Sequence, residues 1–274
     1  MKRLLGFGTL FLCLSAFIVS DEVHYGQIDH NSFGRGEVLN YKLNFGFFTI
    51  GKAKMKVSDD LYNINYRNCY KVDIYGKTVG VVDWVADIDD QWGAYVDTAA
   101  IVPHIAYRKI REGKYKKDEV VRFDHKTNMI EAKVKNQKTG KFKEPMYYSA
   151  PKDIRDLISG FLYLRTVNFS GLALGDTVAV QGFFEDTFYD MQIIYKGKEV
   201  IKTKAGKFNT VKLVPIMPDN KLFDGENSIT TWLTDDENRV PVKLKAEMFI
   251  GSAGVELTGY SGLKNEVNLA KKKR

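Results

Sequence analysis

The alternation of apolar and polar residues at every second position limits most strongly how this chain can fold. In residues 38–45 (VLNYKLNF), leucine and aromatic side chains occupy one face and asparagine and lysine the other. The same period recurs around 52–57, 69–75 and 240–250. Successive side chains of a β-strand point to opposite faces of the sheet. The pattern therefore predicts antiparallel strands with one buried face and one lysine-rich, solvated face.

One segment breaks this period. Between residues 152 and 166, apolar side chains recur at spacings of three and four, which predicts a short amphipathic helix with Pro151 near its start. The expected fold class is therefore mainly β: a large antiparallel meander or barrel-like sheet with one short α-helix.

Three reversals are expected between strands. Residues 120–135 are typical of a hairpin turning at 125–128, and residues 191–203 of another turning at 196–198. The acidic run 235–238 (DDEN) allows two interpretations. It is either a carboxylate cluster that binds a metal or moves protons, or the turn of a further hairpin, since these residues bond their own backbone in turns.

The N-terminus has the pattern of a secretory signal peptide over residues 1–20. Lys2 and Arg3 precede an apolar run that is too short for a confident membrane span. Cys13 lacks the small preceding residue of a lipidated cysteine, so lipidation is disfavoured, and an uncleaved anchor stays open. The remainder, residues 21–274, is expected to form a single barrel-like domain.

Charge and cysteine content exclude several classes of protein. The formal net charge is +7, but the leader contributes two positive charges and the terminal KKKR four, so the body is near +1. A nucleic-acid partner is therefore not expected. The KKKR tail leaves open a contact with an anionic lipid or glycan. Cys69 is the one cysteine after the leader, which excludes an internal disulfide and a thiolate metal site.

Familiar catalytic and cofactor motifs are absent. The sequence lacks G-x-S-x-G, S-x-x-K, H-E-x-x-H, a phosphate-binding loop and G-x-G-x-x-G. Its four histidines are scattered, whereas zinc needs three or four converging ligands. We expect neither a metal nor a cofactor.

The segment ADIDDQW carries the first set of candidate catalytic residues. Asp87 and Asp89 would share one face of a strand, beside Trp84 and Trp92. Two carboxylates and an aromatic platform suit the hydrolysis of a glycosidic bond. The alternative is a solvated edge or turn whose aromatic side chains pack inward.

The segment IAYRKIREGKY carries the second set. His104, Tyr107, Arg108 and Glu112 include the residue types that abstract a proton beside a uronate carboxylate in a polysaccharide lyase. The alternative is an edge strand with cross-strand ion pairs.

Aromatic residues are dense at 45–48 (FGFF) and 182–189 (GFFEDTFY). Strict alternation cannot direct all of them into one core. Phe183, Phe184 and Tyr189, together with Trp84 and Trp92, are therefore candidates to line a cavity for an apolar or sugar ligand. An ordinary large β core is the alternative.

A series of landmarks runs through the chain in fixed order. They are FGRGEVLNYKLNFGFFTIGKAKM, IVPHIAYRKIREGKY, DIRDLISGFLYLR, TKAGKF, WLTDDENRVPVKL and FIGSAGVEL. This series, over about residues 33–258, resembles the DUF3108 family of exported bacterial proteins. The resemblance implies export in a Gram-negative bacterium and a large antiparallel YmcC-like fold. It implies no activity and hence no catalytic residues.

The same resemblance assigns an architectural role to Asp156 and Arg165. Both match the family's Asp-x-x-Ser-x-x-Tyr-x-x-Arg-like stretch, in which Gly160 replaces a more helix-favouring residue. Arg165 falls on the apolar stripe of the expected helix, where a buried guanidinium needs a carboxylate or carbonyls. We expect Arg165 to fix the helix to the sheet or to close the mouth of a barrel, and Asp153 or Asp156 to favour the helix N-terminus.

Together these observations favour a cell-envelope protein located in the periplasm or facing it. The expected function is non-catalytic binding of a lipid or polysaccharide in a concave β interior, with peripheral membrane contact left open. A glycan-active hydrolase or lyase and a structural component of an envelope assembly are the alternatives.

Overall fold

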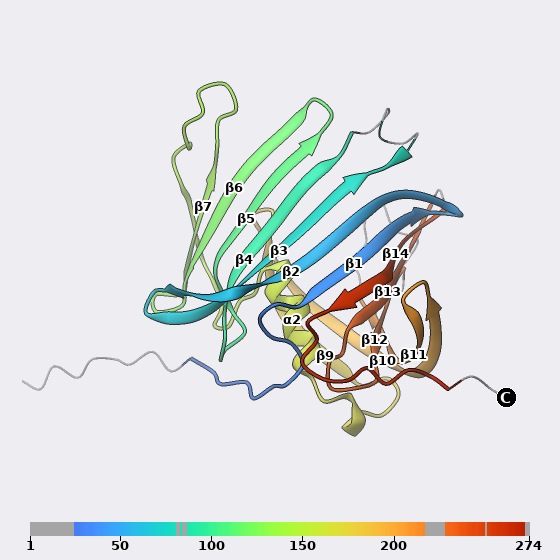
Figure 1. Ribbon diagram of the computed structural model, residues 1–274. Coiled ribbons are helices and arrows are strands. Elements are labelled where there is room, and N and C mark those ends of the chain that lie inside the picture. Colours follow the sequence, from blue (N-terminus) through green and yellow to red (C-terminus); the bar gives the residue numbers. More distant parts are fainter. Residues whose placement is uncertain (1–24, 81–82, 84–86, 217–227, 250, 272–274) are drawn as a thin grey trace, which may run out of the picture.

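A single antiparallel sheet dominates the computed structural model, which describes residues 25–80, 83, 87–216, 228–249 and 251–271 (Figure 1). Its strands are β1 (Val38–Phe45), β2 (Phe48–Ile64), β3 (Arg67–Thr78), β4 (Asp89–Asp97), β5 (Pro103–Glu112), β6 (Tyr115–Asp124), β7 (Met129–Val134), β8 (Met146–Ser149), β9 (Thr177–Phe184), β10 (Thr187–Thr203), β11 (Gly206–Pro215), β12 (Ile229–Thr234), β13 (Pro241–Met248) and β14 (Gly251–Ser261). The α-helix α2 (Leu157–Thr166) and the short 3₁₀ helix η2 (Phe169–Gly171) separate β8 from β9. The expected mainly β fold class is confirmed.

The strand order joins the two ends of the chain at the centre of the sheet. It runs β8-β7-β6-β5-β4-β3-β2-β1-β14-β13-β12-β11-β10-β9, so the first and last strands are neighbours. Strands β8 and β9 form the two edges. The pairings between these strands are antiparallel, and β1 pairs with β14 from Val38 opposite Ser261 to Phe45 opposite Ala253, with one register shift between Asn40 and Tyr41.

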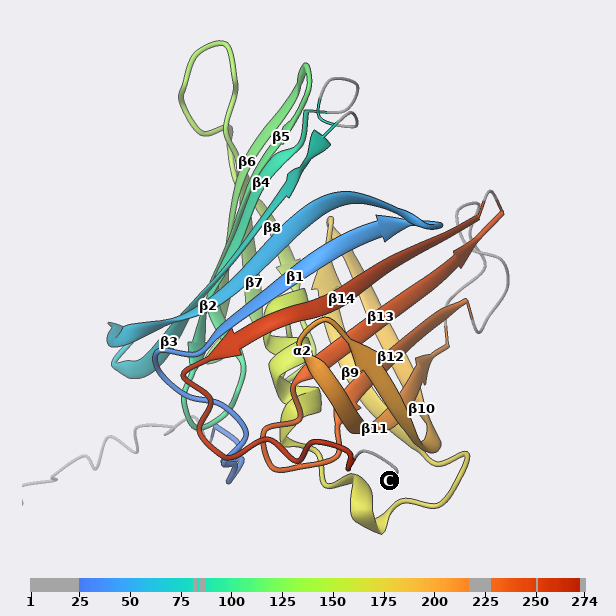
Figure 2. The same ribbon diagram turned by 45° about the vertical axis from the view of Figure 1, so that its right-hand side comes forward.

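The sheet curls around α2, as the two views together show (Figure 2). Ile158 and Leu162 of the helix pack with Leu39, Val57 and Val72, which lie on the inner face of the sheet. A second apolar cluster lies between the end of the helix and β9–β12. The helix therefore lies inside the curl and packs against the inner face of the sheet. Within the described residues, no helix has the length and apolar composition to cross a membrane.

The helix begins five residues later than the sequence pattern predicts. Residues 152–156 are not helical, because Arg155 pairs with β9 instead: its N–H donates to Gln181 O at 3.0 Å, and its carbonyl accepts from Phe183 N at 2.8 Å. Asp153 also has a φ of 55°, which interrupts a right-handed helix. Asp156 then caps α2, accepting from the backbone N–H groups of Ile158 and Ser159.

The predicted hairpin at 191–203 is wrong, whereas the hairpin of β6 and β7 is confirmed. Strand β10 continues through residues 196–198 with a shift in register between Tyr195 and Lys198. Gly197 has a φ of 92° there. The Lys-Gly-Lys signal marks a bulge within one long strand, because glycine serves a bulge as readily as a turn.

Arg165 lies at the end of the curled sheet where α2 meets the turn between β12 and β13, and it is fully buried. Its Nη1 and Nη2 contact the two carboxylate oxygens of Glu37 at 2.5 and 2.8 Å. Its guanidinium also donates to the backbone carbonyls of Ser32 at 2.9 Å and Asn238 at 3.1 Å. One side chain thus joins α2, the start of β1, the segment before it and the turn between β12 and β13.

The acidic run 235–238 is that turn, so the hairpin interpretation is confirmed. Asp236 accepts from Thr234 Oγ1 at 2.7 Å and from the backbone N–H of Asn238 at 3.0 Å. Asn238 is fully buried and exchanges hydrogen bonds with Asn265 in the C-terminal segment. The turn therefore also binds the C-terminal segment to this end of the sheet.

Acidification is expected to destabilise this end of the sheet through His30. The half-buried His30 ring stacks on Phe33 at a centroid distance of 4.4 Å, and burial, with smaller effects of Lys264 and Arg165, lowers its pKa to about 4. The unfolded chain, with a histidine pKa of about 6.5, takes up a proton first. Stability is therefore lost as the pH falls from about 6.5 to about 4, by on the order of 1 kcal/mol after solvent screening.

Urea unfolding of the wild type and of His30→Gln between pH 7 and pH 4 checks this. The variant should lose less stability across that window. Equal pH slopes of the unfolding free energy would contradict the assignment.

Candidate functional site

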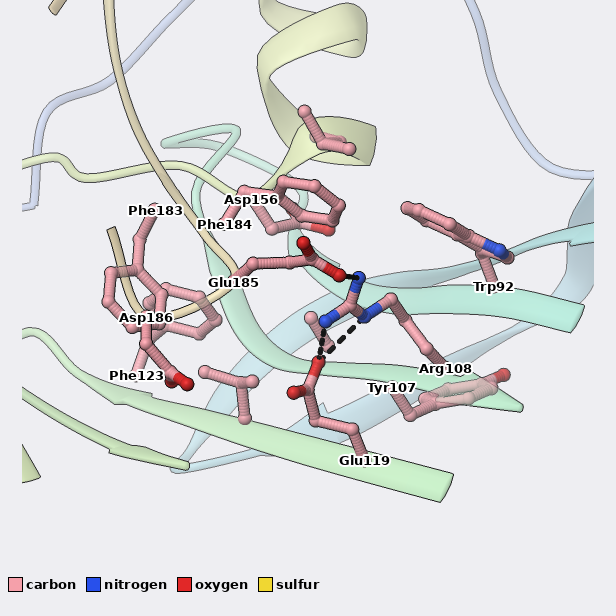
Figure 3. A pocket seen from close by; sticks show the side chains of 13 residues that line it. Trp92, Tyr107, Arg108, Glu119, Phe123, Asp156, Phe183, Phe184, Glu185 and Asp186 are labelled. Carbon is pink, nitrogen blue, oxygen red and sulfur yellow. Dashed lines mark hydrogen bonds and ion pairs between the residues drawn. The ribbon is translucent and has the colours of Figure 1, made fainter. Parts of the chain in front are cut away.

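Arg108 is the centre of an interior cleft where the β9–β10 hairpin meets the inner face of β4–β6 (Figure 3). Its Nε donates to Glu119 of β6 at 2.6 Å, and its Nη1 donates to Glu185 at 3.0 Å. Glu185 and Asp186 form the two-residue turn of the hairpin and have φ values of 47° and 61°. The ion pairs therefore join distant parts of the sheet.

Two aromatic rings enclose the same guanidinium. Trp92 and Phe184 stack at a centroid distance of 5.6 Å, and the guanidinium carbon lies 5.2 Å and 4.5 Å from their respective centroids. The cleft has a volume of about 40 Å³. Pockets for drug-sized ligands have about 300–1,000 Å³. The described part of this cleft therefore accommodates a few waters, and its guanidinium is already paired with Glu119 and Glu185.

Asp156 lines this cleft from the N-terminus of α2. Burial raises the pKa of its carboxyl, while hydrogen bonds from Ser159 and the backbone oppose that shift. Both oxygens accept from the first turn of the helix. The carboxylate is thus engaged in capping rather than free for proton transfer.

The structure does not bring Asp87 and Asp89 together on one face of a strand. Strand β4 begins at Asp89, and Asp87 lies before it with a φ of 37°. Asp87 is exposed, and Asp89 lies on the outer face of the sheet, whereas Trp92 points inward to Arg108. Trp84 lies outside the described residues.

The four candidate lyase residues are also dispersed. Tyr107 and Arg108 lie on opposite faces of β5: Tyr107 donates to Asp73 on the outer face at 2.5 Å, while Arg108 is in the interior cleft. Glu112 is exposed at the end of β5. Burial and the bond to Asp73 raise the pKa of Tyr107 well above its usual range, which is unsuitable for a base.

His104 is buried at the other end of β5. Its Nε2 lies 3.4 Å from Asp97, which Arg67 also contacts at 2.6 Å. Burial alone would raise the pKa of Asp97, but hydrogen bonds from His104, Arg67 and two backbone amides outweigh it and hold that pKa well below its usual range. These residues form a buried structural network.

Three of the aromatic candidates, Trp92, Phe183 and Phe184, line the cleft around Arg108 together, whereas Tyr189 does not. Phe183 packs in an apolar cluster with Phe123, and Tyr189 lies opposite Gly182 on the other face of the hairpin. The FGFF run does not line a cavity: it forms the exposed β1–β2 turn, where Phe47 is fully exposed. Among the described residues, no group of three or more His, Cys, Asp or Glu side chains is placed to hold a metal.

The largest hollow among the described pockets lies instead on the outer face. We call it the lysine groove; it has a volume of about 510 Å³. Its lining side chains and backbone belong to Asn40, Tyr41, Lys42, Thr49, Lys52, Ala53, Lys54, Tyr75, Gly76, Lys77, Asp89, Lys204 and Thr258. Strands β1, β2 and β3 form its floor, and Lys204 comes from the β10–β11 turn.

Strand register places three lysines in one row of the groove. Lys42 lies directly opposite Lys52, and Lys52 lies directly opposite Lys77. Like charges directly opposite each other destabilise a sheet. Lys42 has an ion pair, with Glu256 at 3.2 Å. Within the described part of the chain, neither Lys52 nor Lys77 has a carboxylate within 4 Å, although Lys77 lies directly opposite Asp89. With five lysines and one carboxylate in its lining, the groove carries a net positive charge.

The sequence matches one family of proteins over most of its length. The profile of a family described as "Protein of unknown function (DUF3108)" matches residues 40–258. The chain belongs to the DUF3108 family. No curated protein matches this DUF3108 chain. The match begins seven residues after the expected start at Phe33, and it includes the strands that form the floor of the lysine groove.

Solved structures align with most of this DUF3108 protein at low sequence identity. The crystal structure of a β-barrel-like protein of the DUF1849 family from Brucella abortus is 9% identical, covers 87% of this chain and 99% of its own, and has a TM-score of 0.51. A protein from Bacteroides fragilis, provisionally described as exported and having a YmcC-like fold, is 8% identical over 86% and 99% of the two chains, with a TM-score of 0.34. One from Parabacteroides distasonis, provisionally described as a lipoprotein, is 11% identical over the same shares, with a TM-score of 0.27.

Proposed function

We propose that this DUF3108 protein is exported to the cell envelope, where it binds a phosphate- or carboxylate-bearing lipid or glycan without catalysis. The observation that carries the proposal is the row of Lys42, Lys52 and Lys77, opposed in register across three adjacent strands. The ligand binds in the lysine groove rather than in the concave interior, because α2 occupies that interior. Export rests on the pattern of residues 1–20, which lie outside the described residues.

The groove has the chemistry of an anion-binding surface. Its five lysines provide mobile ammonium donors, and Asn40, Thr49 and Tyr75 add neutral polar groups. An anion bound between opposed lysines relieves their mutual repulsion, so the free energy lost in the empty protein is recovered on binding. Asp89 is the one carboxylate that lines the groove, and it limits how much negative charge the ligand can carry.

Removing one lysine of the row should affect stability and binding in opposite directions. We expect Lys52→Gln to raise the unfolding free energy of the ligand-free protein by about 0.2–1 kcal/mol, because its like-charge contacts with Lys42 and Lys77 are lost. Lys77→Gln should have a smaller effect on stability, because it also loses the cross-strand attraction to Asp89. Each should also weaken binding of an anion by about fivefold to tenfold, the typical effect of one charge-assisted contact. Thermal unfolding and isothermal titration calorimetry measure the two effects.

Two probes separate the two sources of anionic groups. Dihexanoylphosphatidylglycerol, used below its micelle concentration, represents a lipid headgroup, and oligogalacturonate represents an acidic glycan. Dihexanoylphosphatidylcholine and maltoheptaose are the uncharged counterparts. Lys109→Gln is the matched control, because Lys109 lies on the outer face of β5 opposite Asp118 rather than opposite another lysine. Failure of both anionic probes to bind, or equal binding by wild type and Lys52→Gln, would refute the proposal.

A further inference from the structure

Four exposed phenylalanines form an aromatic tip at one end of the sheet. Phe45, Phe47 and Phe48 belong to the β1–β2 turn, and Phe249 to the β13–β14 turn. Their exposed fractions are 40%, 103%, 77% and 65%, respectively. Isolated exposed apolar residues are ordinary, but a cluster of large ones indicates a binding surface.

The two turns that carry the aromatic tip are held side by side. Strands β1 and β14 are paired up to Phe45 opposite Ala253, and the N–H of Gly46 donates to Ser252 O at 2.8 Å. The Phe45 ring also lies over Gly251, where an added Cβ would be 3.4 Å from the ring. Both views show the two turns projecting together from the same end of the sheet (Figures 1 and 2). The phenylalanines therefore project together from a fixed β scaffold.

The lysine groove begins directly behind this tip. Lys52 lies four positions after Phe48 in strand β2, a distance of about 13 Å in an extended strand. Lys42 and Lys77 lie beside Lys52 on the neighbouring strands. Apolar side chains at a tip, with a lysine-rich groove behind them, match the sequence of layers in a bilayer surface: hydrocarbon boundary first, anionic headgroups next.

We propose that the aromatic tip inserts into the interface of an anionic lipid bilayer and brings the lysine groove to the headgroup phosphates. This inference rests on the proposed function and identifies its ligand as lipid in a membrane. A bilayer suits the tip better than a folded protein partner does. The apolar residues form a narrow projection on two turns, whereas a stable protein interface buries about 800 Å² on each partner.

Vesicle cosedimentation with the full protein tests the proposal. Vesicles of phosphatidylglycerol and phosphatidylethanolamine should bind the wild type at least about tenfold more tightly than vesicles of phosphatidylcholine, because each lysine near an anionic surface adds to the attraction. The double substitution Phe47→Ser and Phe48→Ser should weaken binding by at least about tenfold, since two aromatic side chains no longer enter the interface.

The control is Tyr66→Ser. Tyr66 is 94% exposed, and it lies in the β2–β3 turn at the opposite end of β2 from Phe48. This variant should bind vesicles like the wild type. Circular dichroism and thermal unfolding establish that each variant is folded, which is expected because the substituted side chains are exposed. A Phe47→Trp variant adds a direct readout: its additional fluorescence should shift to shorter wavelength with vesicles and be quenched by brominated lipid.

Each result has a definite meaning. Vesicle binding that is unchanged in the Phe47/Phe48 variant overturns the proposal, as does unquenched fluorescence of Phe47→Trp. Loss of a wild-type dimer in that variant, with vesicle binding unaltered, would assign the tip to a second copy of the chain instead. Absence of vesicle binding while soluble dihexanoylphosphatidylglycerol still binds would refute the insertion and leave the groove's proposed function intact.

Discussion

Replacing Arg165 by methionine is expected to destabilise the protein by about 3–5 kcal/mol. The substitution leaves the Glu37 carboxylate buried, with 1% of its surface exposed, and removes its bidentate partner. A buried charge without a partner has one of the largest costs that a single substitution can produce. The Arg165→Met substitution also removes the donors to the backbone carbonyls of Ser32 and Asn238. Urea unfolding followed by fluorescence measures the loss.

The double variant Arg165→Met/Glu37→Leu should recover much of that loss. Removing both charges eliminates the unpaired carboxylate, although the carbonyls of Ser32 and Asn238 still lack their donor. We expect a coupling free energy of about 2 kcal/mol or more between the two sites. Additive effects of the two substitutions would show that the pair contributes no interaction of its own.

Gly262→Ala is the second substitution with a large expected effect, a loss of more than about 3 kcal/mol. Gly262 has a φ of 66°, which costs an L-residue about 1–2 kcal/mol. The added Cβ would also lie 2.2 Å from the carbonyl oxygen of Gly36, a backbone atom that no side-chain rotation can move away. The end of β14 would have to separate from the segment that enters β1.

Gly140→Ala separates the two contributions. Gly140 has nearly the same φ, 69°, but an added Cβ there would meet nothing within 4 Å. Its loss should be limited to about 1–2 kcal/mol of backbone strain. Thermal and urea unfolding of both variants provide the comparison, and equal losses would show that the contact with Gly36 has no energetic importance.

Local alternation predicted the strands because it reports which side chains face the core. The segment 38–45 is strand β1 with the expected bounds, and the acidic run 235–238 is a turn, since its side chains bond their own backbone. The prediction failed where a contact distant in sequence decided the outcome. Arg155 pairs with β9 rather than extending the helix, and Gly197 bends a strand that continues.

The lysine groove could not be predicted from a single strand. The lysines at 52, 54 and 56 are visible in the sequence as one face of a strand. Their alignment with Lys42 and Lys77 depends on the register of two strand pairs, which the alternation alone does not specify. The dispersal of the candidate catalytic residues has the same origin: adjacent residues such as Tyr107 and Arg108 point to opposite faces of a strand.

The pairing of β1 with β14 also affects how the chain can fold. As a polypeptide is made from its N-terminus, β1 and β2 can pair early, but the other edge of β1 has no partner until nearly all of the chain is available. An unpaired strand edge is prone to aggregation, and contacts between residues far apart in sequence form slowly. We therefore expect chaperones to protect the unpaired edge of β1 from aggregation until β14 has been synthesised. Folding of the sheet would then be completed only after synthesis.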